Sequence, residues 1–162
     1  MAEKVGPLNG VRAVTCSTAQ AGTVPYMMMA DLGAEVIKVE VPGIGDGSRT
    51  AGELRGDISS FFETNNRGVK SITLNLKSEE GQKILHKLVE TAVIFGQNFR
   101  PGAAEKNGFG YEELKKINPA LVYVSVSGYG QLGPHSDLPG TDAVGQALGG
   151  ISEAYAGPGE AM

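Results

Sequence analysis

The stretch ADLGAEVIKVEVPGIG, at residues 30–45, decides the fold. Its start has the pattern of a helix end, and Gly33 stands where a helix C-terminus favours a residue that tolerates positive φ. A short apolar run follows, made of Ala34, Val36, Ile37 and Val39. This run predicts a strand that is covered on both faces. Residues 42–46 (PGIGD) then end the strand in a loop that we expect to be flexible.

Strand and helix patterns alternate on both sides of this stretch. Apolar runs typical of strands occur at residues 11–16, 34–39, 69–76, 93–95 and 121–126. Helices are expected to begin near Pro25, after a cap at Asp57, after a cap at Ser78, and at Tyr111 and Asp142. The alternation predicts an α/β fold with a mostly parallel sheet flanked by helices. The more polar second face of residues 69–76 favours an edge position for that strand.

Composition narrows the class of protein. A length of 162 residues favours one domain, and a net charge of −4 without a basic tract argues against a nucleic-acid partner. No apolar run is long enough for a membrane helix, so no membrane association is expected. The single cysteine fits a cytoplasmic protein, and two histidines and one cysteine are too scattered for a zinc site.

Three polar loops follow predicted strands, at residues 17–22, 98–102 and 127–133. Ligands of open α/β sheets bind outside the carboxyl ends of the strands, so these loops are expected to line one crevice. The first loop leads into a helix whose free N–H groups could hold an anion. Ser17, Thr18 and Thr23 either cap that helix or contact a ligand, and the two roles can coexist. The Gly-x-Gly-x-x-Gly spacing of dinucleotide sites is absent from it.

Five single residues have the chemistry for function but also have simpler interpretations. Arg100 and Lys106 either meet phosphates or are solvated loop charges. Cys16 could be a nucleophile, but a buried small apolar residue is favoured because no histidine is near it in sequence. Surface exposure is favoured for His135 and for His86, the latter among charged residues of a helix.

Five motifs follow one another along the chain, at residues 31–46 (DLGAEVIKVEVPGIGD), 66–71 (NRGVKS), 98–102 (NFRPG), 127–134 (SGYGQLGP) and 139–147 (PGTDAVGQA). Together they resemble the signature of the family III CoA-transferases, of the CaiB/BaiF type. The resemblance spans essentially all 162 residues. It implies a Rossmann-like large domain, a smaller second domain and two interlinked subunits, hence a homodimer. Residues 1–162 would then form a single, truncated α/β CoA-binding domain, without the small domain and the C-terminal return.

The resemblance also implies a reaction. Enzymes of this family move CoA between carboxylic acids or isomerise acyl-CoA esters. An aspartate attacks the acyl-CoA and forms an anhydride and then an aspartyl-CoA thioester. In this chain that aspartate is expected beyond Met162, so residues 1–162 alone are expected to be inactive. The implied substrates are an acyl-CoA and a carboxylic acid acceptor, with no metal and no covalently bound cofactor.

Position in the motifs assigns roles to individual residues. Supporting catalytic roles are implied for Gln20 and Asp142. Contacts with CoA are implied for Ala19, Gln20, Leu74, Lys77, Asn98, Phe99, Arg100 and Lys106.

The chain departs from the family pattern at three positions. Val41 stands where some transferases place an arginine beside CoA, Val93 where an aspartate is usual, and Thr141 where the racemase branch carries a histidine. A threonine hydroxyl is too weak a base for α-proton exchange, so transfer is favoured over racemisation. The alternatives are an acyl-CoA racemase and a non-catalytic nucleotide-binding module of Rossmann type. Binding of CoA rather than NAD would separate the module from the two enzymes.

Overall fold

The computed structural model describes residues 6–156, which fall into two compact units, Met1–Val126 and Ser127–Met162. The single domain expected over residues 1–162 stays a prediction.

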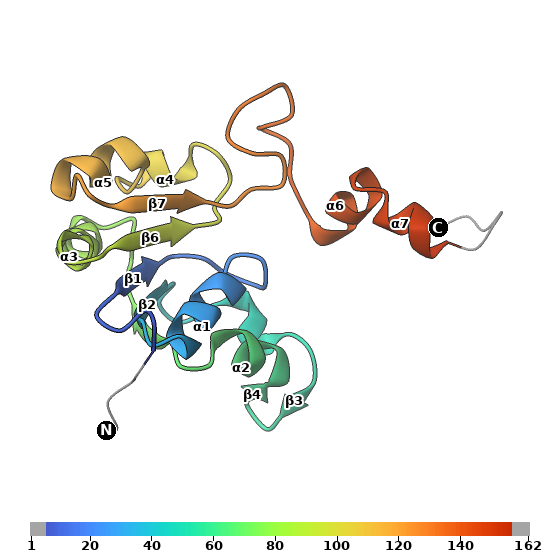
Figure 1. Ribbon diagram of the computed structural model, residues 1–162, viewed down its shortest axis with the longest axis horizontal. Helices are drawn as coiled ribbons and strands as arrows, with labels where there is room; N and C mark the ends of the chain where they lie inside the picture. Colours follow the sequence, from blue (N-terminus) through green and yellow to red (C-terminus); the bar gives the residue numbers. More distant parts are fainter. Residues whose placement is uncertain (1–5, 157–162) are drawn as a thin grey trace. The chain divides into compact units, whose positions relative to one another are not determined.

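A five-stranded sheet forms the centre of the first unit (Figure 1). Its strands lie in the order β5 (Lys70–Thr73), β2 (Glu35–Glu40), β1 (Arg12–Thr15), β6 (Ile94–Gln97) and β7 (Val122–Ser125). Every neighbouring pair is parallel. The predicted α/β class, the parallel sheet and the edge position of β5 are therefore confirmed.

Helices connect these strands, as parallel pairing requires. They are α1 (Val24–Asp31), α2 (Ser60–Asn66), α3 (Glu79–Glu90), α4 (Ala103–Lys106) and α5 (Tyr111–Ile117). Ser78 caps α3 by accepting a hydrogen bond from the Gly81 amide, as its position predicts. Gly33 follows α1 with φ of 101°, which confirms the expected left-handed turn before β2.

One prediction about the segment between β2 and β5 is wrong. Asp57 does not cap α2; it lies in the turn of a short antiparallel hairpin, β3 (Leu54–Arg55) and β4 (Ile58–Ser59). Ser59 caps α2 instead, by accepting a hydrogen bond from the Phe62 amide. Two-residue strands leave almost no periodic pattern in a sequence, so the hairpin and the short helix η1 (Gly47–Thr50) were not predicted.

The sheet separates two apolar clusters. On one face, Val14, Val39 and Phe95 pack against the inner residues of α3 and α5, above all Leu85, Val89 and Leu114. On the other face, Ala13 and Val36 pack against Tyr26 and Ala30 of α1. Helix α2 lies beside α1 (Figure 1). The strand β2 is thus covered on both faces, as its apolar run predicts.

The second unit contains two short helices, α6 (Asp142–Leu148) and α7 (Ile151–Tyr155). Thr141 caps α6, and its hydroxyl accepts a hydrogen bond from the Val144 amide at 3.5 Å. Gly128 and Gly140 meet so closely that a Cβ on either would lie within 2.4 Å of the other's Cα. Neither helix has a buried residue.

Candidate functional site

A cavity of about 260 Å³ lies at the carboxyl ends of the central strands. Cys16 and Thr18 follow β1, Val41 and Pro42 follow β2, and Leu74 and Lys77 follow β5. Phe99, after β6, and Asn107 and Phe109 also line it, together with Val39 and Glu40 at the end of β2 and with Asn75 and Leu76. Most of the lining is apolar, and Lys77 is exposed at its edge. The cavity lies where parallel α/β sheets bind their ligands.

The loops after β1 and β6 are tied together by Asn98. Its side-chain amide donates to the Thr18 carbonyl at 2.9 Å and accepts from the Thr18 amide at 2.9 Å. Gly22 permits this approach, because a Cβ there would lie 2.6 Å from the Asn98 amide nitrogen. Two of the three predicted polar loops therefore meet. The third loop, at residues 127–133, belongs to the second unit.

The start of α1 differs from the prediction of a free anion site. The amides of Thr23 and Val24 both donate to the Gln20 carbonyl, and those of Tyr26 and Met27 donate to the Thr23 carbonyl. Pro25 has no amide hydrogen. The first turn of α1 is therefore already satisfied. Thr23 occupies the N-cap position, but its hydroxyl donates back to the carbonyls of Ala19 and Gln20 and does not cap the helix.

Ser17 and Ala19 are unusual residues of the same loop. The Ser17 hydroxyl is buried and has no hydrogen-bond partner within residues 6–156. Ala19 has φ of 59°, the single positive φ outside glycine in the described part of the chain. Its amide donates to both carboxylate oxygens of Asp46, at 3.2 Å each. An alanine in the left-handed region costs about 1–3 kcal/mol, so the surrounding contacts must maintain it.

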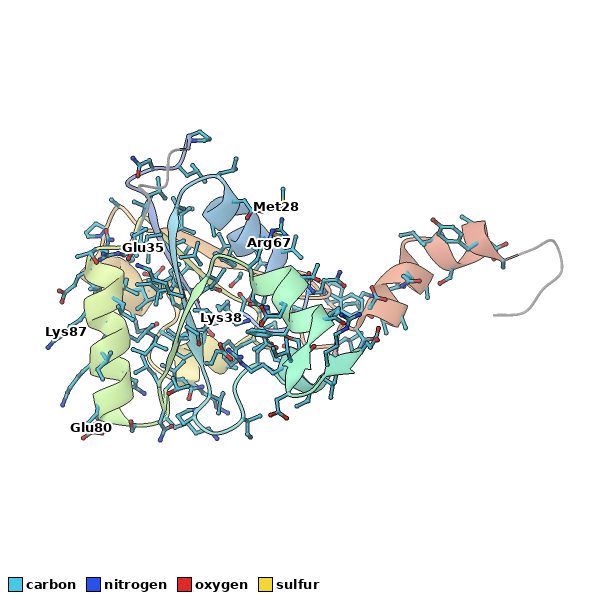
Figure 2. The ribbon with its side chains drawn as sticks, turned by 90° about the horizontal axis from the view of Figure 1, so that it is seen from below. Met28, Glu35, Lys38, Arg67, Glu80 and Lys87 are labelled. Carbon is cyan, nitrogen blue, oxygen red and sulfur yellow. The ribbon has the colours of Figure 1, made fainter. Side chains whose placement is uncertain are left out.

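A buried ion pair lies directly behind this loop. Lys38, on β2, donates to Asp46 and, at 2.7 Å, to the side-chain oxygen of Asn66 on α2. The side chains of Lys38 and Asp46 are 1% and 0% exposed. Figure 2 shows Lys38 in the interior of the unit, whereas Lys87 projects outward from α3. Asp46 also accepts hydrogen bonds from the amide and hydroxyl of Ser48, at 2.8 and 2.7 Å.

A second carboxylate extends this network. Glu40 accepts hydrogen bonds from the Asp46 amide at 2.7 Å, from Ser71 at 2.5 Å and from two nitrogens of Arg49. The Arg49 guanidinium also lies 3.8 Å from the centre of the Phe62 ring. We name Lys38, Glu40, Asp46, Arg49 and Asn66 the polar core. The loop at residues 42–46 is thus present as predicted, but Asp46 at its end is fixed rather than flexible.

The electrostatics of the polar core keep its carboxylates ionised. Burial alone would raise the pKa of Glu40, but hydrogen bonds from Arg49, Ser71 and the Asp46 amide outweigh it and lower that pKa to about 2. Burial likewise opposes ionisation of Asp46, yet Lys38 and Ser48 bring its pKa below the ordinary value. Burial lowers the pKa of Lys38, and Asp46 offsets part of this effect.

The structure brings together some of the residues predicted to contact CoA. Leu74, Lys77 and Phe99 line the same cavity. Asn98 lies beside it, where its side chain is engaged with Thr18. Ala19, Gln20, Arg100 and Lys106 are exposed, and Lys106 precedes the lining residue Asn107. Asp142 lies in the second unit, where it accepts a hydrogen bond from Gln146 at 2.5 Å.

The other candidate residues are placed as follows. Cys16 is a free thiol, 2% exposed, and burial raises its pKa, which confirms the prediction of a buried apolar role. His135 is exposed, as predicted. His86, predicted at the surface, is half-buried rather than fully exposed, and its Nε2 hydrogen-bonds to the Gly108 carbonyl at 2.8 Å. Among residues 6–156 no group of three potential metal ligands occurs, and no helix could span a membrane.

A larger cavity, of about 580 Å³, lies at the opposite end of the sheet. Its lining includes Arg12, Glu35 and Lys70, whose side chains are joined by ion pairs of 2.6 and 2.7 Å. These residues stand at the amino ends of β1, β2 and β5. The charged side chains Arg12, Glu35 and Lys70 in this cavity are paired with one another. Parallel α/β sheets bind their ligands at the carboxyl ends of the strands, not at the amino ends. We therefore place the functional site at the smaller cavity.

Comparison with protein families decides the class. The model of CoA-transferase family III matches residues 8–162. The chain belongs to this family. An acetyl-CoA:oxalate CoA-transferase of Acetobacter aceti is 43% identical over 157 residues, which cover 97% of the chain and 40% of the relative. A human succinyl-CoA:glutarate CoA-transferase is 42% identical over 148 residues, which cover 91% of the chain and 34% of the relative.

Solved structures agree with this assignment. A CaiB/BaiF family protein from Brucella suis superposes with a TM-score of 0.90 and 38% identity, covering 96% of this chain and 42% of the other. Rv3272 from Mycobacterium tuberculosis gives a TM-score of 0.87 at 37% identity, covering 96% and 44%. This family III chain thus spans about 40% of the length of the relatives it matches.

The polar core is the part of this family III site that residue patterns missed. Lys38 and Glu40 alternate with apolar residues in the sequence EVIKVE, a pattern that also suits a strand with one solvated face. The one available signal was the covered strand itself: if both faces of β2 are buried, its charged side chains must be buried and paired.

Proposed function

We propose that the first unit binds acyl-CoA at the 260 Å³ cavity, as the CoA-binding part of an enzyme that moves CoA from an acyl-CoA to a carboxylic acid. One observation carries this proposal. Leu74, Lys77 and Phe99, assigned to CoA by their motif positions, come from two separate segments and line one cavity. Relatives that match the chain are named as transferases of CoA between acids such as succinate and glutarate, or to oxalate.

The cavity offers contacts both to the uncharged parts and to the phosphates of an acyl-CoA. Its apolar floor, from Val39, Leu74 and Phe109, offers contact to uncharged parts of the ligand. Lys77 at its edge supplies a cation for phosphates. Arg100 and Lys106 are also exposed, and they are the sequence neighbours of the lining residues Phe99 and Asn107. Val41 lines the cavity and is 54% exposed, so no cation is available at that position.

The reaction is assigned through the family. Gln20, in the loop after β1, is proposed to face the reacting thioester, and a supporting catalytic role is proposed for Asp142. The aspartyl anhydride and the aspartyl-CoA thioester form on a carboxylate that we assign to no residue of this chain. A homodimer and a cytoplasmic location are part of the same proposal, and the buried free thiol of Cys16 suits a reducing compartment.

Calorimetric titration of the 162-residue chain tests this function. CoA should bind, and NAD at the same concentration should neither bind nor compete. Lys77→Ala and Lys106→Ala should each weaken CoA binding at least about tenfold, because a charge-assisted contact contributes about 1.5–3 kcal/mol. Lys87→Ala is the matched control, since Lys87 is an exposed lysine that does not line the cavity (Figure 2). Unchanged affinity in both test variants would refute the phosphate contacts, and preference for NAD would refute the function.

A further inference from the structure

Buried contacts hold the loop at Ala19 and Gln20, and what we infer from them rests on the proposed function of that loop. The backbone around Gln20 is fixed on both sides. The Ala19 amide donates to Asp46, and the Ala19 carbonyl accepts from the Thr23 hydroxyl. The Gln20 carbonyl accepts the amides of Thr23 and Val24 at 3.0 Å each.

The Gln20 side chain, by contrast, is exposed and makes no hydrogen bond to any of residues 6–156. A fixed backbone that presents a free polar side chain is the arrangement expected of a group that orients a ligand. Ala19 is conformationally strained in this arrangement, because its φ of 59° is unfavourable for a residue with a Cβ. A specific partner must therefore keep Ala19 in this conformation.

Asp46 is that partner. Both of its carboxylate oxygens accept the Ala19 amide hydrogen, and the carboxylate itself is held by Lys38 and by the amide and hydroxyl of Ser48. Lys38 is in turn anchored to Asn66, whose own side-chain nitrogen donates to the Phe62 carbonyl of α2. The loop after β1 is thus connected through buried groups to β2 and α2.

We infer that Asp46, held by Lys38, is a positioning residue: its carboxylate maintains the left-handed conformation of Ala19 and so aims the Gln20 side chain at the acyl-CoA site. Asp46 touches no substrate in this arrangement. It acts through the Ala19 peptide, and Lys38 acts through Asp46.

Amide hydrogen exchange on the unsubstituted chain tests the contact without any variant or ligand. The amides of Gln20 and Ala21 have no partner among the described residues, whereas that of Ala19 donates to Asp46. After correction for intrinsic rates, the Ala19 amide should exchange at least about tenfold more slowly than the other two, as expected for a hydrogen bond to a charged group. Equal rates for the three amides would overturn the inference.

Substitution separates positioning from mere stability. Asp46→Asn leaves one uncharged acceptor oxygen in place of two charged ones, so it should bring the exchange rate of the Ala19 amide closer to that of Gln20 and weaken CoA binding about tenfold. Adding Ala19→Gly to this variant should restore most of the lost affinity, because glycine adopts positive φ without strain. Asp31→Asn is the control; Asp31 is an aspartate paired with Arg67 at the surface, and its replacement should change neither measurement.

The outcomes are distinguishable from failure of the proposed function. If the unsubstituted chain does not bind CoA, the proposed function fails, while the exchange rates still decide whether Asp46 holds Ala19. If Asp46→Asn folds and binds CoA weakly but Ala19→Gly gives no recovery, the role of Asp46 is structural and the inference is overturned. If Asp46→Asn does not fold, the exchange rates of the unsubstituted chain decide.

Discussion

The two faces of β2 are both buried, yet they are filled in opposite ways. Toward α3 and α5, Ile37 and Val39 join an apolar cluster around Phe95 and Leu85. Toward α1 and α2, Val36 is followed by Lys38 and Glu40, whose charges meet Asp46 and Arg49. Alternation along a strand places these sets on opposite faces. Packing of the apolar face stabilises the sheet against α3 and α5. The charged face holds the loops that flank the proposed CoA site in place.

The difference shows where stability and function are separated in this fold. The charged residues of this face lie in the carboxyl half of β2, next to the cavity. In the amino half of β2, the same face packs on α1 through Val36. Buried ion pairs seldom add more stability than apolar residues of the same size would. We therefore interpret the polar core as a device that specifies geometry rather than one that maximises stability.

Removing one charge from the polar core should have the largest effect. Lys38→Met keeps the length of the side chain but leaves the Asp46 carboxylate buried without a cation, which costs about 3–5 kcal/mol. Urea denaturation measures the free energy of unfolding. Arg67→Met is the control, because Arg67 and its partner Asp31 are 54% and 43% exposed, and such pairs contribute at most about 1 kcal/mol. Equal losses in the two variants would remove the distinction between the polar core and surface pairs.

The apolar face should respond slightly less to a single change. Leu85→Ala creates a cavity at a fully buried position and should lower the free energy of unfolding by about 3 kcal/mol. Ile84→Ala, one residue away on α3, is the matched control, since Ile84 is 43% exposed and should cost under about 1 kcal/mol. The affinity of the folded Leu85→Ala variant for CoA should be unchanged. A stability loss for Ile84→Ala equal to that for Leu85→Ala would contradict the assignment of faces.

The same helix illustrates what sequence patterns could and could not provide. The start of α3 after Ser78 was predicted, and of its apolar residues Leu85 and Val89 are fully buried whereas Ile84 is 43% exposed. Periodicity, caps and glycine positions predicted the starts of α5 and α6 and the alternation of strands and helices that gives a parallel sheet. They did not predict the hairpin β3–β4, because strands of two residues show no period.

The candidate site was predicted in part. Motif positions identified Leu74, Lys77 and Phe99, which meet at the cavity. The contacts of Lys38, Asp46 and Ala19 depend on side chains from segments far apart in sequence, and no local pattern reports which charges are paired in the interior. The satisfied amides of α1 were also unpredictable, because they depend on the carbonyl of Gln20 turning back onto the helix.

Acidification should produce a smaller effect that again distinguishes the two faces. Against the effect of burial, hydrogen bonds from Arg49, Ser71 and the Asp46 amide lower the pKa of Glu40 from its ordinary value of 4.5 to about 2, so its contribution to stability is fully present above pH 4.5 and is lost as pH falls toward 2. Arg49 is 41% exposed and solvent screens the pair, so the loss stays below about 3 kcal/mol. Unfolding followed from pH 6 to pH 2 measures it, and Glu40→Gln should flatten this part of the profile. An unaltered acid profile in Glu40→Gln would show that Glu40 does not contribute.

We propose that acyl-CoA binds at the carboxyl ends of the strands and not in the larger cavity at their amino ends. Titration of the isotope-labelled chain with CoA, followed by NMR chemical shifts of the backbone amides, tests it most directly. We expect saturable shifts concentrated at Thr18, Gln20, Leu74 and Phe99, with little change at Arg12, Glu35 and Lys70. Shifts concentrated at Arg12, Glu35 and Lys70, or no saturable shift at all, would contradict it.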